Sequence, residues 1–296
     1  MTIHWKEDAK PTAVWTPAHV PINWEEDVNE LLEKNVSRGV IRNVPEGIPT
    51  QWCSRMIVAK KKSGKLRQCV DLRKVNDATD RELHHQRTAY KLICDLPPNM
   101  LKTSLDCWNS YHALELDEEA SSTTTFITEQ GTFQYLRAPQ GLWSSGDAYT
   151  RQTDDIVRDV EDKRKYVNDT LLFKPSKEEL FWRTARYIDK CGRAGIIFKP
   201  DKFKFSQEEL EFARFHLTRD GFKPTQTTLQ SIKNFPVPRN ITDVRSYFGL
   251  VEQVVFAFSK SEVMYLFREL LRKNRKFYWD DKLSEVFNKS RDYIVE

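Results

Sequence analysis

Four consecutive residues, Tyr166-Val167-Asn168-Asp169, constrain the fold of this chain more than any other stretch. Within this stretch, Asn168 and Asp169 separate two strand-like runs, residues 164–167 and 170–173. The stretch therefore predicts a strand-turn-strand hairpin with a polar tip. A tip with two adjacent carboxylates that faces a third carboxylate on a neighbouring strand can hold two Mg²⁺ ions. Asp106, far upstream in Leu105-Asp106-Cys107, is placed to supply that third group. In this chain one of the two tip positions is the amide Asn168.

The length of 296 residues is ample for a buried core and fits one large domain or two to three subdomains. The longest apolar runs, such as residues 254–258, are far shorter than the roughly 20 residues of a membrane-spanning helix. The acidic, tryptophan-bearing start does not resemble a signal peptide. We therefore expect an intracellular protein with no membrane partner.

Five cysteines with wide spacing and no Cys-x-x-Cys motif indicate neither a disulfide framework nor a zinc site. We expect all of them to be reduced core residues. They are Cys53, Cys69, Cys94, Cys107 and Cys191.

Basic side chains are clustered, although 47 of them almost balance 43 acidic ones for a net charge of +4. One cluster contains no acid and comprises Arg55, Lys60, Lys61, Lys62, Lys65 and Arg67. The other comprises Arg268, Arg272, Lys273, Arg275 and Lys276. Two separated basic patches are typical of a chain that grips a phosphate backbone at two places. The alternative is a solvated hairpin tip and a solvated helix face.

The first half of the chain predicts an arm, a helix and a hairpin. Residues 1–22 have no helical or alternating period and contain three prolines, which predicts an extended arm. Asn23 as N-cap, with Glu26 three residues on, predicts an amphipathic helix to about Arg38. Residues 56–60 and 66–70 flank Lys62-Ser63-Gly64-Lys65, a hairpin signal with basic side chains at its tip.

The rest of the chain mixes strands and helices without a regular repeat, which indicates an α+β fold. Strands are predicted at residues 102–106, 123–127 and 132–136, and a helix at residues 146–160. Ser176 and Glu179 form a capping box that opens a helix ending at Gly195. After about Gly221, two apolar stripes predict a helical subdomain. The stripes are Val244, Tyr247, Phe248 and Val251, and Val263, Phe267 and Leu270.

An ordered series of segments carries a family resemblance. The series is Lys61-Lys62-Ser63-Gly64-x-x-Arg67, Val70 to Asn76, Leu105 to His112, Thr124 to Thr128, Ala138 to Leu142, Tyr166 to Phe173, Gly195 to Phe203, Leu210 to His216 and Pro236 to Leu250. In this order the segments resemble the reverse transcriptase of gypsy-type LTR retrotransposons, a Metaviridae-like pol polyprotein, with an altered Tyr-x-Asp-Asp motif. The similarity runs from about Lys6 to the C-terminus.

The resemblance implies an α+β fold with a right-hand polymerase architecture of fingers, palm and thumb, in which an antiparallel palm sheet packs on helices. It places an extended arm at 1–23, the fingers at 24–82 and 114–144, the palm at 83–113 and 145–218, and a helical thumb with the start of a connection at 219–296. Ribonuclease H and integrase domains are expected elsewhere in a parent polyprotein. The implied location is a cytoplasmic virus-like particle, with the nucleus as a second location.

The resemblance and the residue chemistry assign the same roles. The catalytic residues are Asp106, Asn168, Asp169 and Lys202, of which the first three would hold two Mg²⁺ ions, or Mn²⁺ instead. Lys202 matches a lysine suggested to protonate the leaving pyrophosphate. The nucleotide-binding residues are Lys61, Arg67, Tyr111, Gln140 and Gly141. The primer-binding residues are Phe212, Arg214 and His216.

Each nucleotide-binding role has a physical reason. Lys61 and Arg67, on the two arms of the basic hairpin, would clamp a triphosphate, although the sequence leaves open which of the lysines 60–62 makes the contact. Tyr111 would lie beneath the sugar and reject ribonucleotides, with plain core packing as the alternative. Gly141 lets the backbone beside Gln140 approach the incoming nucleotide closely.

Asn168 is the main departure from the family, which has a metal-binding Asp at that position. An amide offers a neutral oxygen. Two unit charges ~4 Å apart interact by about 4 kcal/mol at an effective dielectric constant of ~20, and a divalent ion roughly doubles this energy. A loss of several kcal/mol slows catalysis roughly a thousandfold or more. Arg214, where the family usually has glycine, and residues 120–122, where it usually has an arginine, point the same way.

Two functions compete. The first is an RNA-directed DNA polymerase, strongly impaired by Asn168, that extends a primer annealed to an RNA or DNA template with deoxynucleoside triphosphates. The second is a catalytically dead polymerase-fold relic or module that only binds template-primer. An unrelated soluble protein with coincidental motifs is a third interpretation.

Overall fold

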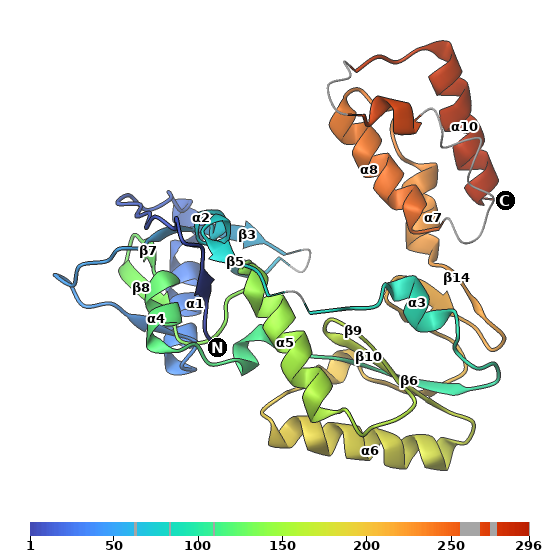
Figure 1. Cartoon of the computed structure of the whole chain (residues 1–296), viewed down its shortest axis with the longest axis horizontal. Helices are drawn as coiled ribbons and strands as arrows, with labels where there is room; N and C mark the ends of the chain where they lie inside the picture. Colours follow the sequence, from blue (N-terminus) through green and yellow to red (C-terminus); the bar gives the residue numbers. More distant parts are fainter. Residues whose placement is uncertain (62–63, 83, 109, 255–266, 273–276, 296) are drawn as a thin grey trace. The chain divides into compact units, whose positions relative to one another are not determined.

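The computed structural model describes residues 1–61, 64–82, 84–108, 110–254, 267–272 and 277–295. Two compact units make up the chain (Figure 1). The first unit consists of Met1–Gln86, Leu105–Thr170 and Phe181–Phe203, and the second of Arg87–Ser104, Leu171–Leu180 and Lys204–Glu296.

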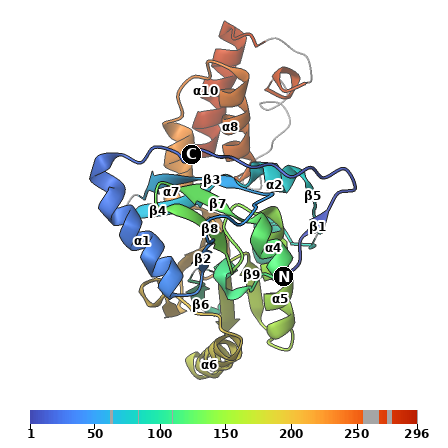
Figure 2. The ribbon, with the colours of Figure 1, turned by 90° about the vertical axis from the view of Figure 1, so that its left-hand side faces the viewer.

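The first unit contains a five-stranded sheet with the strand order β2-β8-β7-β3-β4. Its strands are β2 (Ile41–Asn43), β3 (Ser54–Lys60), β4 (Leu66–Val70), β7 (Phe126–Thr128) and β8 (Gly131–Tyr135). Neighbours are antiparallel except β3 and β7, which are parallel with Ser54 opposite Phe126. Helix α1 (Glu25–Ser37) contacts β2 and β4 (Figure 2). The predicted hairpin at residues 56–70 is confirmed by the β3–β4 pairing.

Buried side chains on one face of this sheet share a hydrophobic core with α1. In β3, Met56 is buried and Ile57 is exposed, as expected for a sheet with one face on the core. Val28 and Leu32 of α1 belong to the same core, to which burial of each aliphatic side chain contributes roughly 1.5–3 kcal/mol. The predicted N-cap Asn23 is wrong, because it lies inside a 3₁₀ turn, η1 (Ile22–Trp24), and α1 begins after it.

Shorter elements complete the first unit. They are β1 (His4–Trp5) paired with β5 (Thr79–Asp80), α2 (Arg73–Asp77), η2 (Ser110–Ala113), α4 (Glu118–Thr123), α5 (Trp143–Ile156) and η3 (Pro200–Lys202). The strand predicted from residue 123 is wrong at its start, since β7 begins at Phe126. The hydroxyls of Thr123, Thr124 and Thr125 each donate to a carbonyl three residues back and so close α4 instead. The predicted helix at 146–160 begins and ends earlier, at Trp143 and Ile156.

A four-stranded sheet has the order β11-β6-β10-β9. Its strands are β6 (Leu101–Asp106), β9 (Lys163–Tyr166), β10 (Asp169–Lys174) and β11 (Lys204–Gln207). The hydroxyl groups of Thr170 in β10 and Tyr187 in helix α6 (Lys177–Arg193) hydrogen-bond at 2.8 Å, which ties the helix to the sheet. The predicted cap is confirmed, because the Glu179 amide donates to the Ser176 hydroxyl at 3.2 Å.

The second unit contains a small sheet and a helical cluster. Its further elements are α3 (Ala89–Ile93), the antiparallel strands β12 (Leu210–Phe212), β13 (Phe215–Leu217) and β14 (Phe222–Pro224), and the helices α7 (Gln226–Lys233), α8 (Ile241–Glu252) and α10 (Asp281–Val295). The predicted stripe on α8 is buried at Val244, Tyr247 and Val251 and partly buried at Phe248. Phe267 and Leu270 of the second stripe join the same core, whereas Val263 lies outside the described residues.

All five cysteines are free thiols. Cys53, Cys107 and Cys191 are buried and Cys69 is half-buried, but Cys94 is exposed, so its predicted core position is wrong. Cys94 is the C-cap of the short helix α3, where a side chain faces solvent easily. In the described part of the chain, no helix combines the length and the apolar character that crossing a membrane requires.

Candidate active site

Three chain segments meet at Asp106 in the first unit. The amide of Cys107 donates to the carbonyl of Asn168 at 3.1 Å, which joins the end of β6 to the β9–β10 tip. The amide of Lys199 donates to the carbonyl of Asp106 at 2.9 Å, and Trp108 donates to Ile197 at 2.7 Å. The structure therefore brings Asp106 together with the hairpin tip.

The tip of the β9–β10 hairpin is strained. Val167 and Asn168 link the two strands, and Val167 has a φ of +53°. A positive φ at the first turn position is the one that a type II′ hairpin fills with glycine. For an L-residue this conformation costs roughly 1–2 kcal/mol, and β-branched residues adopt it rarely.

Asn168 already uses its side-chain oxygen. The Ser110 hydroxyl donates to Asn168 Oδ1 at 2.8 Å, and Ser110 is buried in the 3₁₀ turn η2. A buried hydroxyl needs such an acceptor. The amide oxygen at the tip is thus held by a neighbour within the protein.

Asp106 carries its charge between two lysines. Lys199 Nζ contacts Oδ1 of Asp106, and Lys202 Nζ lies 2.6 Å from Oδ2. Burial raises the pKa of Asp106, but the hydrogen bonds from Lys199 and Lys202 outweigh it, so that the pKa falls below its ordinary value. The hydrogen bond that Lys202 donates to Asp106 in turn raises the pKa of Lys202.

Asp169 behaves oppositely. Burial raises the pKa of its carboxyl above the ordinary value, and the negative charge of Asp106 raises it further. The charges of Lys202 and Lys199 offset part of this rise. Of the two carboxylates, Asp106 is therefore compensated inside the protein and Asp169 is compensated incompletely.

The donor set does not fit the expected pair of Mg²⁺ ions. It consists of two carboxylates and one amide, and within the described residues no three His, Cys, Asp or Glu side chains group together to hold a metal ion. Both oxygens of Asp106 accept from ammonium groups, and Asn168 Oδ1 accepts from Ser110. Mg²⁺ and Mn²⁺ prefer charged oxygen ligands that are free to coordinate.

Four of the five residues predicted to bind the nucleotide, Lys61, Arg67, Gln140 and Gly141, lie on or next to the β3–β4 hairpin and the loop before α5. Arg67, on β4, donates through Nη2 to Gln140 Oε1, so the structure brings these two predicted residues together. Gly141 has a φ of +102°, and its carbonyl accepts from Asn76 Nδ2 at 2.8 Å. Asn76 Oδ1 also accepts from the Trp143 amide at 2.9 Å, which anchors the loop. Lys61 is exposed beyond the end of β3.

The cations of the β3–β4 hairpin differ in their partners. Arg55 donates to the carbonyl and hydroxyl of Thr16 at 3.2 and 3.1 Å, which ties it to the N-terminal arm. Lys62 lies outside the described residues. The remaining four, among the residues that the structure describes, form no ion pair with an acid. They are Lys60, Lys61, Lys65 and Arg67. In the second basic cluster Arg272 pairs with Glu269 at 2.7 Å, and Lys273, Arg275 and Lys276 fall outside the described residues.

Tyr111 is half-buried in η2. Its ring meets that of Tyr149 edge to face, with centroids 5.8 Å apart. Burial raises the pKa of the Tyr111 hydroxyl, as does the nearby charge of Asp147. A Cβ at Gly146 would lie 3.9 Å from that hydroxyl, which is an ordinary van der Waals contact. The role of Tyr111 beneath a sugar stays a prediction.

The residues predicted to bind the primer lie in the second unit. Phe212 is buried in β12 opposite Phe215 of β13, and His216 Nε2 lies 3.0 Å from Glu209 Oε2. Ala213 and Arg214 connect the strands with φ values of +48° and +73°. Two consecutive positive φ angles are typical of a type I′ turn, which favours Asn-Gly. The bulky Arg214 therefore strains this turn.

Sequence reasoning missed two residues of this site, Lys199 and Ser110. A signal for Lys199 existed, since Pro200 opens the 3₁₀ turn η3. Lys199 is the N-cap of this turn and Lys202 is its last residue, three positions on, and both ammonium groups reach Asp106. For Ser110 the sequence offered only a short polar segment around Asn109, which lies outside the described residues.

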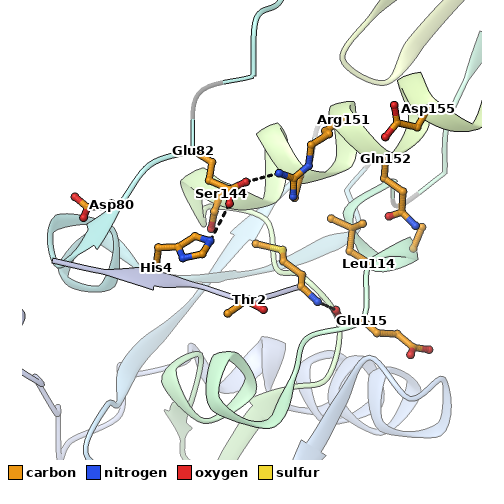
Figure 3. Close-up of a pocket in the computed structure, with 13 residues that line it drawn as sticks. Thr2, His4, Asp80, Glu82, Leu114, Glu115, Ser144, Arg151, Gln152 and Asp155 are labelled. Atoms are coloured by element: carbon orange, nitrogen blue, oxygen red, sulfur yellow. Dashed lines mark hydrogen bonds and ion pairs between the residues drawn. The ribbon is translucent and has the colours of Figure 1, made fainter. Parts of the chain in front are cut away.

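A cavity of about 700 Å³ lies elsewhere in the first unit, between the N-terminal arm and α5 (Figure 3). Glu82 bridges it, because its carboxylate lies 2.8 Å from His4 Nε2 and 2.7 Å from Arg151 Nη1. None of the residues predicted for catalysis or binding lines this cavity. Its size alone assigns it no chemistry.

Comparison with known proteins agrees with the geometry. A family model described as reverse transcriptase (RNA-dependent DNA polymerase) matches residues 58–217, more than half of the chain. This chain belongs to the reverse transcriptase family. The matched residues of this reverse transcriptase domain include Asp106, the β9–β10 tip and Lys202.

The curated relatives of the domain are polyproteins. The retrovirus-related Pol polyprotein from transposon 297 of Drosophila melanogaster is 28% identical over 234 residues, which cover 76% of this chain and 22% of the relative. The transposon Tf2-3 polyprotein of Schizosaccharomyces pombe is 22% identical over 271 residues, covering 90% and 20%. The chain thus spans about a fifth of the length of these relatives and resembles a retrotransposon reverse transcriptase.

Solved structures of a foamy viral protease-reverse transcriptase share the fold. The complex with RNA/DNA hybrid has a TM-score of 0.80 at 18% identity, covering 99% of this chain and 41% of that chain. The complex with double-stranded DNA of a form named dRH has a TM-score of 0.83 at 18% identity, covering 100% and 53%. These matches confirm the predicted α+β polymerase fold. The subdomain boundaries stay a prediction.

Proposed function

We propose that this chain is the reverse transcriptase domain of a gypsy-type LTR retrotransposon polyprotein. It grips a primer annealed to an RNA or DNA template, and its transfer of deoxynucleotides to the primer is strongly impaired. The observation that carries this proposal is the meeting of Asp106 with a hairpin tip that bears Asn168 beside Asp169. The sequence at 166–169 is then an altered Tyr-x-Asp-Asp motif.

Template-primer binding is supported by the free positive charge of the β3–β4 hairpin. Phosphate contacts by lysine and arginine dominate nucleic-acid affinity, and cations without acidic partners are the ones available for them. The relative with the same fold was solved with RNA/DNA hybrid and with double-stranded DNA. In this proposal Arg67 and Lys61 receive the triphosphate of an incoming nucleotide.

Weak turnover is supported by the state of the acidic residues. In a complete site of this family, two divalent ions would activate the primer hydroxyl and neutralise the triphosphate. In this chain, Asp106 and Asn168 have their oxygens engaged by lysines and by Ser110. Lys202 is protonated at neutral pH, since its pKa is raised, and it orients Asp106. In this proposal Tyr111 lies beneath the sugar, and Gly141 lets the backbone approach the incoming nucleotide closely.

A second candidate function is a polymerase-fold module that binds template-primer and has lost turnover altogether. The observation that favours it is the same lysine compensation of Asp106. Both candidates predict salt-dependent binding of nucleic acid. They differ only in whether any metal supports incorporation.

The experiment measures binding and extension on the same samples. Fluorescence anisotropy with an RNA·DNA template-primer should give an affinity that falls steeply with salt. For duplex DNA, each contacted phosphate lowers the logarithm of the binding constant by about 0.9 for every tenfold increase in salt concentration. Primer extension with Mg²⁺ or Mn²⁺ should be faster for Asn168→Asp than for the unaltered chain. Binding that ignores ionic strength contradicts both candidates. Extension by Asn168→Asp alone, with none by the unaltered chain, favours the second.

A further inference from the structure

Lys199 occupies a position beside Asp106 that no predicted role covers. Its ammonium group contacts Asp106 Oδ1, while Lys202 contacts Oδ2, so the two oxygens of one carboxylate are shared between two lysines. The side chain of Asp106 is 16% exposed, that of Lys199 30% and that of Lys202 55%. Lys199 is therefore the more enclosed of the two partners.

The backbone fixes Lys199 in this position. Residues 197–199 run beside residues 106–108, with a bridge between Phe198 and Cys107. The Lys199 amide donates to the carbonyl of the same Asp106 whose side chain it contacts, at 2.9 Å. Pro200 then opens η3 and limits the backbone of Lys199, because the residue before a proline is held extended. Moving the ammonium group away requires a rotamer change, and the chain cannot shift easily.

Charges at the site add to zero. Asp106 and Asp169 carry two negative charges, and Lys199 and Lys202 carry two positive ones. A divalent ion that approaches Asp106 meets both ammonium groups, and each repels it twice as strongly as it repels a unit charge. Replacing Asn168 by Asp adds one negative charge but leaves both oxygens of Asp106 engaged.

We propose that Lys199 is the built-in counter-cation of Asp106 and a second block to divalent metal binding, independent of Asn168. This inference rests on the proposed function, because it concerns the same site. Lys199 takes the place of a metal as the group that compensates Asp106. Restoring an acid at position 168 therefore recovers only part of the metal affinity, and removing Lys199 as well frees Asp106 Oδ1 and recovers a further part, while Lys202 stays on Oδ2.

The test compares four proteins: the unaltered chain, Asn168→Asp, Lys199→Ala and the double variant. Their Mn²⁺ binding is measured by electron paramagnetic resonance and by metal-dependent thermal shift. We expect the double variant to bind Mn²⁺ at least about tenfold more tightly than Asn168→Asp. Equal affinity of these two variants overturns the proposal. Lys190→Ala is the matched control, since Lys190 pairs with Asp159 at 2.8 Å and is 32% exposed; it should change nothing.

Two further readouts separate the possible failures. Circular dichroism checks that each variant folds, and Lys199→Gln, which keeps the stem without the charge, replaces Lys199→Ala if that variant unfolds. Template-primer binding without metal is measured on the same proteins. If it is absent in all of them, the proposed function fails. If it is present and Mn²⁺ affinity is unaffected by Lys199, only this inference fails.

Discussion

Two regions of the first unit use their charges in opposite ways. At the acidic region, formed by Asp106, Asn168, Asp169, Lys199 and Lys202, opposite charges neutralise each other within the protein. At the basic region, the β3–β4 hairpin with its contact to Gln140, four cations have no acidic partner among the described residues. The cations of the basic region are therefore available to an external anion. The carboxylate of Asp106 in the acidic region is already paired with lysines and is not available to an external cation.

In the proposed function, this difference lets a reverse transcriptase fold retain nucleic-acid binding without efficient chemistry. Phosphate binding needs only exposed cations on a suitable surface. Two-metal transfer needs several free carboxylate oxygens held in fixed geometry, and one amide or one misplaced ammonium group disturbs it. The acidic region is thus the more fragile of the two.

Neutralising Asp106 and neutralising Asp169 should change the stability of the protein in opposite directions. If both variants change it in the same direction, the comparison between the two regions fails. Asp106→Asn should lower the free energy of unfolding by about 2 kcal/mol, because two lysines lose their partner. The loss is limited because Lys202, which is 55% exposed, is rehydrated. Asp169→Asn should raise that free energy, since the variant removes a charge that burial disfavours. Urea unfolding of both variants measures the difference. In a site of mutually repelling carboxylates, Asp106→Asn would stabilise instead.

The basic region is tested by removing one unpaired cation. Arg67→Ala should weaken template-primer or nucleotide binding about tenfold and reduce the salt slope by about one phosphate contact. Arg158→Ala is the control, because Arg158 is an exposed arginine that already pairs with Asp155. Anisotropy titrations at several salt concentrations compare the two. Equal effects of both variants would show that the hairpin has no special role.

The left-handed turn in the second unit extends the comparison to the hairpin that is predicted to bind the primer. Arg214→Gly should stabilise the protein by about 1 kcal/mol, since glycine adopts the observed φ of +73° without steric cost. Lys204→Gly, at an exposed strand position with ordinary backbone angles, should destabilise it. Thermal unfolding distinguishes the two signs. A destabilised Arg214→Gly would mean that the arginine makes contacts that outweigh the strain.

The pH dependence gives the smallest effect and sharpens the contrast between the two aspartates. Asp106 has a lowered pKa, so its ion pairs contribute stability that is present above the ordinary value of 3.8 and is lost as the pH falls through the lowered pKa. Asp169 has a raised pKa, so its charge costs stability at neutral pH; this cost decreases as the pH falls through the raised value and is gone below the ordinary value of 3.8. The advantage of Asp169→Asn over the unaltered chain should therefore shrink between pH 7 and pH 4. An advantage that grows on acidification would contradict the assignment.

Much of the fold followed from local patterns. Both hairpins, residues 56–70 and 163–174, were predictable because alternating strands flank short polar turns. The start of β7 was not, since the hydroxyls of three threonines bond back to helix α4, a choice that propensity alone does not reveal. Asn23 was mistaken for a cap because a 3₁₀ turn precedes α1.

The candidate site was predictable in its members but not in their pairing. The order of motifs gave Asp106, the hairpin tip and Lys202, whose proximity depends on the strand order. The contact between Lys199 and Asp106 joins residues 93 positions apart, and periodicity carries no information on such a contact. The same holds for Ser110 and Asn168, which are 58 positions apart.

The most direct test of the account is single-nucleotide incorporation by the unaltered chain, measured on a template-primer complex that anisotropy shows to be saturated, with Mg²⁺ and then with Mn²⁺. The account predicts full binding with incorporation roughly a thousandfold slower than that of the Asn168→Asp/Lys199→Ala variant. Incorporation by the unaltered chain at the rate of that variant would contradict it.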